Sequence, residues 1–337
     1  MQKLMPKLIA AGAVLLIVIA YVASNIFYYL HEPLVFDEPV TIDFEPGSSI
    51  RTLANQLQSH DLLEHPRYLR IWGRLTGTAT RLQAGEYVFQ PGQAIADLID
   101  DMVAGRVKQY AFTVVEGWTF REFLNALAAH EAVEHTLKDV DYDHVMSVLG
   151  YADQHPEGRF FPDTYFIHKK TIDTALLQRA YARMDSYLHT LWSERDHDLP
   201  FKTPYEALIM ASIVEKESAR PEERPIIAGV FINRLRKGMR LQTDPTVIYG
   251  IGESYDGDIR YRDLRTDTPY NTYTRSGLTP TPIAMPGLGA LKAVMHPADT
   301  GYLYFVATGD GSGRHVFSAT LEEHEKAVDQ YQRKRNL

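Results

Sequence analysis

The hydrophobic positions of this chain begin with one unbroken run. Leu8 to Leu30 contains no charged residue. A helix rising about 1.5 Å per residue would carry this run across a bilayer core of about 30 Å. Lys3 and Lys7 precede the run, and acidic residues follow it. Because basic residues collect on the cytoplasmic side, the pattern predicts a cytoplasmic N-terminus at residues 1–7, a transmembrane anchor at residues 8–30 and an external remainder.

A cleaved signal peptide is the alternative interpretation of the same run. Val22, Ala23 and Ser24 could form a small-residue cleavage site. The run is longer, however, than the roughly 7–15 apolar residues of an ordinary signal peptide. Its length therefore favours an uncleaved anchor. No later segment is apolar enough to span a bilayer, so we expect a single-pass protein.

After the run, the pattern changes to short amphipathic segments. Within residues 31–105, two segments with strand character enclose two helical segments, and a third helix follows. Pro-Gly pairs mark the turns between them. The sequence therefore predicts a tether and a small module in the order strand, helix, helix, strand, with elements at Val40–Phe44, Ile50–Leu57, Pro66–Leu75, Gly85–Phe89 and Ala94–Ala104.

Residues 106–337 combine longer helical periods with short strand patterns. The fold class is therefore predicted to be α+β, with a single N-terminal transmembrane helix, a small βααβ module and a larger mixed α/β domain. The elements expected in the larger domain are strands at Tyr110–Val115 and Met239–Gln242, helices after Thr119, over 172–195, over 203–218 and over 221–237, and a hairpin of Tyr302–Val306 with His315–Ser318.

Composition and charge narrow the possible functions. The chain is 45% hydrophobic and 23% charged, as in globular proteins. It contains no cysteine, which excludes disulfides and cysteine nucleophiles. The net charge is −8 without a long Lys/Arg run, so nucleic acid is not an expected partner. His130 and His135 would lie about 140° apart on a helix and cannot share a metal. We therefore predict no metal and no cofactor.

Glu217 stands out because it falls on an apolar helix face. Thr203 and the proline after it form a helix start. At 100° per residue, Met210, Ile213 and Val214 share one stripe with Glu217 at its centre. Burial disfavours a charged carboxylate and raises its pKa. A carboxylic acid that stays protonated near neutral pH suits general-acid cleavage of a glycosidic bond.

A buried structural ion pair is the competing interpretation of Glu217. Arg224 and Arg234 are candidate partners, and structural pairs also perturb pKa values. Periodicity alone favours this ion pair over a catalytic role.

Two further clusters are candidate binding residues. Gln242, Thr243 and Asp244 lie where a strand leads into a helix, a common place for site residues, although Thr243 or Asp244 could simply cap that helix. A second segment combines aromatic rings with amide and hydroxyl groups, as carbohydrate sites do. Its residues are Tyr270, Asn271, Thr272 and Tyr273.

Several motifs together resemble the endolytic murein transglycosylases of the YceG-like family. They occur in one order, from the anchor nearly to the C-terminus. The Leu-Gln-Thr-Asp-Pro-Thr run that begins at Leu241 is the most specific. The matching segments are Glu157–Thr164, Ala211–Glu217, Val230–Leu235, Gly238–Gly250, Tyr270–Tyr273 and Leu303–Val306.

The resemblance implies a lyase anchored in the bacterial inner membrane, with a periplasmic YceG-like catalytic domain and a LysM-like small module. Its substrate would be the glycan strands of peptidoglycan. Cleavage between N-acetylmuramic acid and N-acetylglucosamine would leave a 1,6-anhydro end and terminate nascent strands, with peptidoglycan synthases as partners. The family's catalytic glutamate corresponds to Glu217, and this match reverses the preference for a structural ion pair.

The chemistry leaves two alternatives to this assignment. A transglycosylase needs one carboxyl group that first donates and then accepts a proton, whereas an ordinary glycosidase needs two. Asp244 and Glu223 are the plausible second carboxylates for a muramidase-type hydrolase. A membrane-tethered, non-catalytic scaffold that binds the cell wall is the other alternative.

Overall fold

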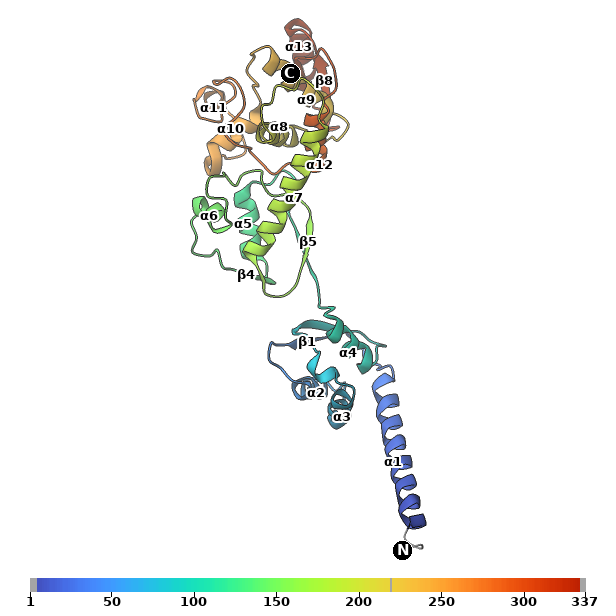
Figure 1. Ribbon diagram of the computed structural model, residues 1–337. Coiled ribbons are helices and arrows are strands. Elements are labelled where there is room, and N and C mark those ends of the chain that lie inside the picture. Colours follow the sequence, from blue (N-terminus) through green and yellow to red (C-terminus); the bar gives the residue numbers. More distant parts are fainter. Residues whose placement is uncertain (1–4, 219, 334–337) are drawn as a thin grey trace. The chain divides into compact units, whose positions relative to one another are not determined.

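Two units make up the part of the chain that the computed structural model describes, residues 5–218 and 220–333. The first holds the chain up to Tyr110 together with Phe166–Lys170. The second holds Ala111–Tyr165 and the chain from Thr171 onward (Figure 1). Residues 1–4 of the expected cytoplasmic segment lie outside the described residues. The boundary between residues 105 and 106 stays a prediction.

The first unit begins with helix α1, Met5–His31. Within the described ranges, α1 alone is long and apolar enough to cross a membrane. Most of its apolar side chains are exposed, but Ile26 and Leu30 are buried in the core of the first unit. The last turn of α1 therefore packs against the segments that follow it.

Those following segments form a small α/β module. Strands β1, Val40–Phe44, and β2, Gly85–Phe89, pair antiparallel. Alternation along the pair buries Ile42, Phe44, Tyr87 and Phe89. The predicted order of strand, helix, helix, strand and a further helix is confirmed. The helices are α2, Ile50–Ser59, α3, Pro66–Leu75, and α4, Ile95–Ala104, with a 3-10 turn at Thr78–Thr80.

The rest of the chain mixes helices with short two-stranded pairs, which confirms the predicted mixed α/β character. Strand β3 pairs with β5, β4 with β6 in parallel, and β7 with β8 antiparallel. The strands are β3 Tyr110–Thr113, β4 Val133–Glu134, β5 Thr164–Ile167, β6 Thr171–Ile172, β7 Tyr304–Ala307 and β8 His315–Ser318. The helices are α5 Phe120–Ala129, α6 Val145–Val148, α7 Asp173–Glu194, α8 Pro204–Glu217, α9 Arg224–Arg236, α10 Asp244–Ile251, α11 Tyr261–Arg265, α12 Leu288–Met295 and α13 Leu321–Val328.

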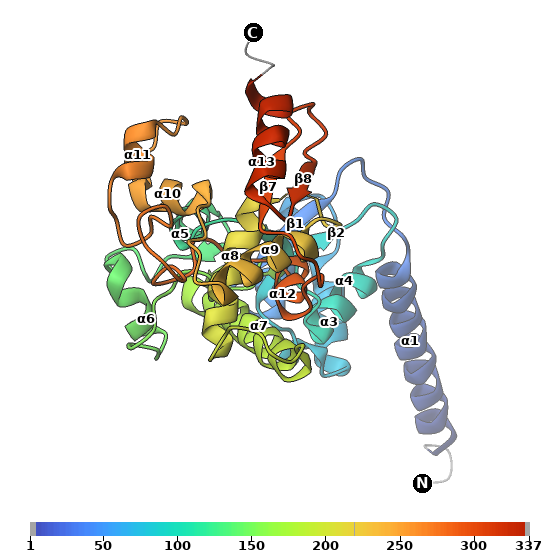
Figure 2. The ribbon, with the colours of Figure 1, turned by 90° about the horizontal axis from the view of Figure 1, so that it is seen from above.

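Helix α8 is the centre of the second unit. The Thr203 hydroxyl accepts the Glu206 N–H at 3.2 Å and caps the first turn, as predicted. Every residue from Ala207 to Val214 is buried, and α7, α9, α10 and α12 pack around the helix (Figure 2). A helix that is apolar on all sides is a core helix. The stripe that singled out Glu217 is thus one of several buried faces.

The strand predicted at Met239–Gln242 is absent, so that prediction was wrong. The Arg234 guanidinium donates to the carbonyls of Arg240 and Leu241, at 3.2 and 2.8 Å, where a neighbouring strand would donate. Gln242 then adopts a φ of 51°, which an extended strand cannot contain. The segment is an irregular connection, held by Arg234 and by the Gln242 N–H, which donates to the Thr272 carbonyl at 3.2 Å.

Candidate functional site

Glu217 and Thr243 join the end of one helix to the start of another. Glu217 is the last residue of α8, and Thr243 directly precedes α10. The Thr243 hydroxyl donates a 2.6 Å hydrogen bond to Glu217 Oε2 and makes no capping bond within α10. The proposed capping role of Thr243 is therefore wrong, because its hydroxyl is committed to the carboxyl group.

The environment of Glu217 favours its protonated form. Burial raises the pKa of this carboxyl, and the nearby charge of Asp244 raises it further. The hydrogen bond from Thr243 and the proximity of His315 lower the pKa, but the net shift is upward. The side chain is only half-buried, so it remains accessible while its proton is held more tightly than usual.

The buried ion pair considered for Glu217 is formed two residues earlier, by Glu215. Glu215 Oε1 accepts from Arg224 at 2.8 Å, and Oε2 accepts the Gly287 N–H at 3.0 Å. Arg234 donates to backbone carbonyls, including that of Leu303 at 2.6 Å. Across residues 5–218 and 220–333, Glu217 forms no ion pair with a lysine or arginine.

A cleft of about 520 Å³ opens in front of Glu217. One side is formed by the segment before α10 and by the loop that carries Tyr273. The other side is formed by β7, β8 and α13, which pack together beside α9 (Figure 2). The lining residues include Glu217, Arg234, Gln242, Thr243, Asp244, Tyr273, Tyr304, His315, Leu321 and His324.

Four of the predicted binding residues line this cleft. The Tyr273 hydroxyl donates to Asp244 Oδ1 at 2.6 Å, which ties the aromatic loop to the first residue of α10. Gln242 is exposed, and its Oε1 lies 3.4 Å from Arg234 Nη1. Its left-handed backbone is uncommon for a residue other than glycine. Thr243 completes this group through its bond to Glu217.

The other three predicted binding residues lie behind the cleft wall. Asn271 is buried and donates to the backbone carbonyls of Asp263 and Leu264 in α11 and of Thr266 directly after it. The Thr272 hydroxyl accepts the Thr243 N–H at 3.1 Å. The Tyr270 hydroxyl lies 2.9 Å from the Thr281 hydroxyl. These contacts position the loop and Thr243, while direct contact of Tyr270, Asn271 and Thr272 with substrate stays a prediction.

His315 is a cleft residue that the sequence did not indicate. Its Nδ1 donates to Glu223 Oε2 at 2.7 Å, and its backbone N–H donates to Glu223 Oε1 at 3.1 Å. Glu223 therefore orients the ring, and Nε2 has no hydrogen-bond partner in the described part of the chain. Tyr304 and His324 stack on one another with ring centroids 5.1 Å apart. Tyr304 and His315 belong to the C-terminal hairpin, and His324 belongs to α13. The period-two pattern of the hairpin indicated strands but no cleft residues.

A second carboxyl with a raised pKa lies outside the cleft lining. Glu157 is 1% exposed. Its Oε1 accepts the Phe120 N–H at 2.9 Å and its Oε2 accepts the Tyr249 hydroxyl at 2.9 Å. Burial raises its pKa to about 7, although these hydrogen bonds act in the opposite direction. Glu157 links α5 to α10 and has no access to the cleft.

The match to a family model defines the class of protein. Residues 42–330 match the model of the YceG-like family, which is most of the chain. The chain belongs to the YceG-like family, and the resemblance seen in its motifs is confirmed.

Named relatives and a solved structure support this membership. The chain is 35% identical to the endolytic murein transglycosylase of Bacillus subtilis (strain 168), over 90% of this chain and 88% of the relative. It is 28% identical to the endolytic murein transglycosylase of Streptococcus pneumoniae, over 87% of this chain but only 58% of that protein. A crystal structure of a yceG-like protein from Listeria monocytogenes, 29% identical, covers 86% of this chain with a TM-score of 0.56.

Proposed function

We propose that this protein is an endolytic peptidoglycan lytic transglycosylase with Glu217 as its acid and base. One observation carries the proposal. Glu217, whose pKa is raised, faces an open cleft and, among the residues that the structure describes, is held by a single hydroxyl group. Two relatives bear the name endolytic murein transglycosylase, and their reaction fits such a carboxyl group.

The proposed reaction proceeds without water. Protonated Glu217 donates its proton to the glycosidic oxygen as the bond to C1 of the muramoyl residue breaks. The C6 hydroxyl of the same sugar bonds to C1 and gives its proton to the Glu217 carboxylate. The products are a 1,6-anhydromuramoyl end and a new 4-hydroxyl group, and the enzyme returns to its starting state.

The hydrogen bonds of Glu217 suit this cycle. Thr243 fixes Oε2, while Oε1 accepts no hydrogen bond from the residues that the structure describes. Oε1 is therefore the oxygen available to the substrate. Asp244 adds negative charge beside the cleft and is itself oriented by Tyr273. Positive charge develops at C1 in the transition state, so Asp244 would stabilise it.

Asp244 also supports a second candidate, a muramidase-type hydrolase. It is the only other carboxylate among the described cleft-lining residues. In a hydrolase it would act as the second carboxyl group, either by activating water or as a nucleophile. The two mechanisms differ in product, because hydrolysis leaves a reducing end that is one water heavier than the anhydro end.

The cellular setting is part of the proposal. Helix α1 would be a single-pass anchor in the inner membrane, with the N-terminus in the cytoplasm and the catalytic residues in the periplasm. Its exposed apolar length and the basic residues before it support this orientation. The small module would be LysM-like, and peptidoglycan synthases that make nascent strands would be the partners.

Product analysis tests the proposed reaction. The full chain in detergent would be incubated with uncrosslinked glycan strands, and the new ends identified by mass spectrometry. We expect anhydro ends with the wild type and none with Glu217→Gln. Glu253→Gln, a 79% exposed site on another element, is the matched control and should retain the wild-type rate. A majority of reducing ends would establish the hydrolase, and cleavage by Glu217→Gln would refute the assignment of Glu217.

A further inference from the structure

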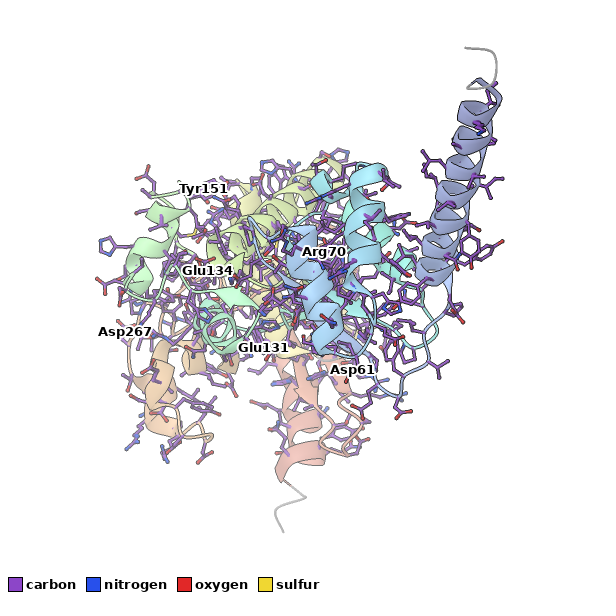
Figure 3. All side chains as sticks on the ribbon, turned by 90° about the horizontal axis from the view of Figure 1, so that it is seen from below. Asp61, Arg70, Glu131, Glu134, Tyr151 and Asp267 are labelled. Carbon is purple, nitrogen blue, oxygen red and sulfur yellow. The ribbon has the colours of Figure 1, made fainter. Side chains whose placement is uncertain are left out.

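Helix α3 of the first unit has a surface that the glycan-cleaving site does not explain. Arg67, Arg70 and Arg74 fall within about 60° of one another around its axis, at 100° per residue. Arg51 of α2 joins Arg70 and Arg74 around a hollow of about 310 Å³. None of these four arginines forms an ion pair with an acidic residue in the described ranges. Figure 3 labels Arg70 on this unit.

An exposed apolar stripe runs beside the arginines on the same helix. Ile71 is 44% exposed and Leu75 is 79% exposed. The opposite side of α3, with Leu69 and Gly73, is buried in the module. Helix α3 thus has three faces. One is buried in the module, the second is basic, and the third is apolar and exposed. Helices with a basic face next to an exposed apolar face are typical of membrane surfaces.

The start of α3 is fixed to the end of α1. The Tyr29 hydroxyl accepts the backbone N–H groups of Glu64 and His65 at 2.9 and 3.1 Å, directly before Pro66. The Tyr68 ring packs edge-on against Tyr29 with centroids 5.4 Å apart. Tyr29 is almost the last residue of the apolar run. The first turn of α3 is therefore held at the depth where that run ends, which is the headgroup level of a bilayer.

We propose that α3 lies on the membrane surface and binds the phosphates of anionic phospholipid headgroups. Ile71 and Leu75 would enter the boundary of the acyl chains. Arg67, Arg70, Arg74 and Arg51 would contact the phosphates, to which guanidinium groups donate two hydrogen bonds at once. This inference rests on the proposed membrane anchor, because α1 sets the depth of α3. It does not depend on the direction in which α1 crosses.

The absence of cysteine from the chain provides a direct test. The full chain carrying Leu75→Cys would be labelled with an environment-sensitive fluorophore and reconstituted into phosphatidylcholine vesicles with or without phosphatidylglycerol. Neutral acrylamide would then quench the probe. Val148→Cys, at a 52% exposed residue of the second unit, is the control. With phosphatidylglycerol, we expect quenching at position 75 to be about 3-fold or more weaker than at position 148.

Removal of the arginines should abolish that protection. Arg67→Gln, Arg70→Gln and Arg74→Gln together should restore strong quenching at position 75, because each basic residue contributes to attraction by an anionic surface. Added inorganic phosphate should change nothing. Four results would each overturn the proposal. Two of them are equal quenching at positions 75 and 148 and protection of position 75 without phosphatidylglycerol. The other two are protection that remains in the triple arginine variant and protection that is lost when free phosphate is added.

Two controls separate this inference from the proposals on which it rests. Vesicle flotation reports the anchor, and a chain that fails to float would overturn both the anchor and the role of α3. A chain that floats but leaves position 75 open to acrylamide overturns only the role of α3. The triple arginine variant should still release anhydro ends from soluble glycan, since these residues lie in the first unit, outside the cleft.

Discussion

The regions around Glu157 and Glu217 differ in access rather than in acidity. Both carboxyl groups have a raised pKa, and burial is the main cause for both. Glu157 is 1% exposed and receives donors on both oxygens. Glu217 is half-buried, accepts one hydrogen bond within residues 5–218 and 220–333, and faces a cleft of about 520 Å³. A raised pKa alone therefore does not indicate a catalytic group. What distinguishes Glu217, the proposed catalytic group, is a carboxyl oxygen without a hydrogen-bond donor among the described residues, on a side chain that lines the cleft.

Neutralising Glu217 should have the largest effect on cleavage. Glu217→Gln should lower the cleavage rate by about 10³-fold or more, since one group supplies both the acid and the base. The free energy of unfolding should hardly change, because this carboxyl forms no ion pair with any lysine or arginine that the structure describes. Initial rates of anhydro-end formation, together with urea unfolding, measure the two effects. A variant that unfolds at a clearly lower urea concentration than the wild type would instead assign Glu217 a structural role in the core.

The second test concerns the neighbouring carboxylate, Glu215. Glu215→Gln should lower the free energy of unfolding by about 3–5 kcal/mol, because the buried Arg224 loses its closer and more buried carboxylate partner. Glu116→Gln removes a longer contact to the same arginine, 3.6 Å, from a half-exposed side chain, and should cost less than about 1 kcal/mol. Urea unfolding followed by tryptophan fluorescence compares them. Equal losses would contradict the assignment of the ion pair.

The third test uses the pH dependence of Glu157. Its pKa is about 7 in the folded chain against an ordinary 4.5. The neutral Glu157 carboxyl therefore makes its full contribution to the stability of the folded chain below about pH 4.5, and this contribution is lost as the pH rises through 7. The stability of the wild type relative to Glu157→Gln should fall by about 3 kcal/mol between pH 4 and pH 8.

The activity of Glu157→Gln is a further test of the difference between the two carboxyl groups. Glu157→Gln should cleave glycan within a few-fold of the wild-type rate, since Glu157 does not line the cleft. Unfolding curves at several pH values and the rate at one pH are the measurements. A folded variant without activity would place Glu157 in the reaction.

The smallest expected effect comes from Thr243. Thr243→Val removes the hydroxyl that lowers the pKa of Glu217, so that pKa should rise further. The rate, which requires the protonated acid, should then persist to higher pH. Loss of the orienting bond should reduce the maximal rate by about 10-fold or less. A pH–rate profile of the variant, compared with Thr243→Ser, decides the matter. An alkaline limb that moves to lower pH would contradict the role given to Thr243.

The sequence predicted features that depend on neighbours along the chain. Thr203 caps α8 as expected, and the strand and helix order of the small module follows its period-two and period-3.6 patterns. Glu217, predicted as the catalytic acid, does line the cleft, while its catalytic role stays a prediction and the periodicity behind that choice was incomplete. A helix buried on every side has no single core stripe, so its pattern could not show that Glu215 forms the ion pair.

The features that the sequence did not predict depend on distant contacts. His315 meets Glu223 across 92 positions, and Glu215 meets Gly287 across 72. Neither separation leaves a local signal. The missing strand at Met239–Gln242 is an exception with a local cause, because the side chain of Arg234, only six and seven positions before Arg240 and Leu241, takes the place of a strand neighbour.

The burial of α8 on all sides has a consequence for protein engineering. The helix holds Glu217 in a fixed position. Substitutions between Ala207 and Val214 would meet packed atoms in every direction and yield unfolded variants. Diversity in a library aimed at new glycan preferences belongs on the opposite side of the cleft. Tyr304, Leu321 and His324 contribute to that side from the hairpin and α13. Selection there could change the choice of substrate while the acid stays in place.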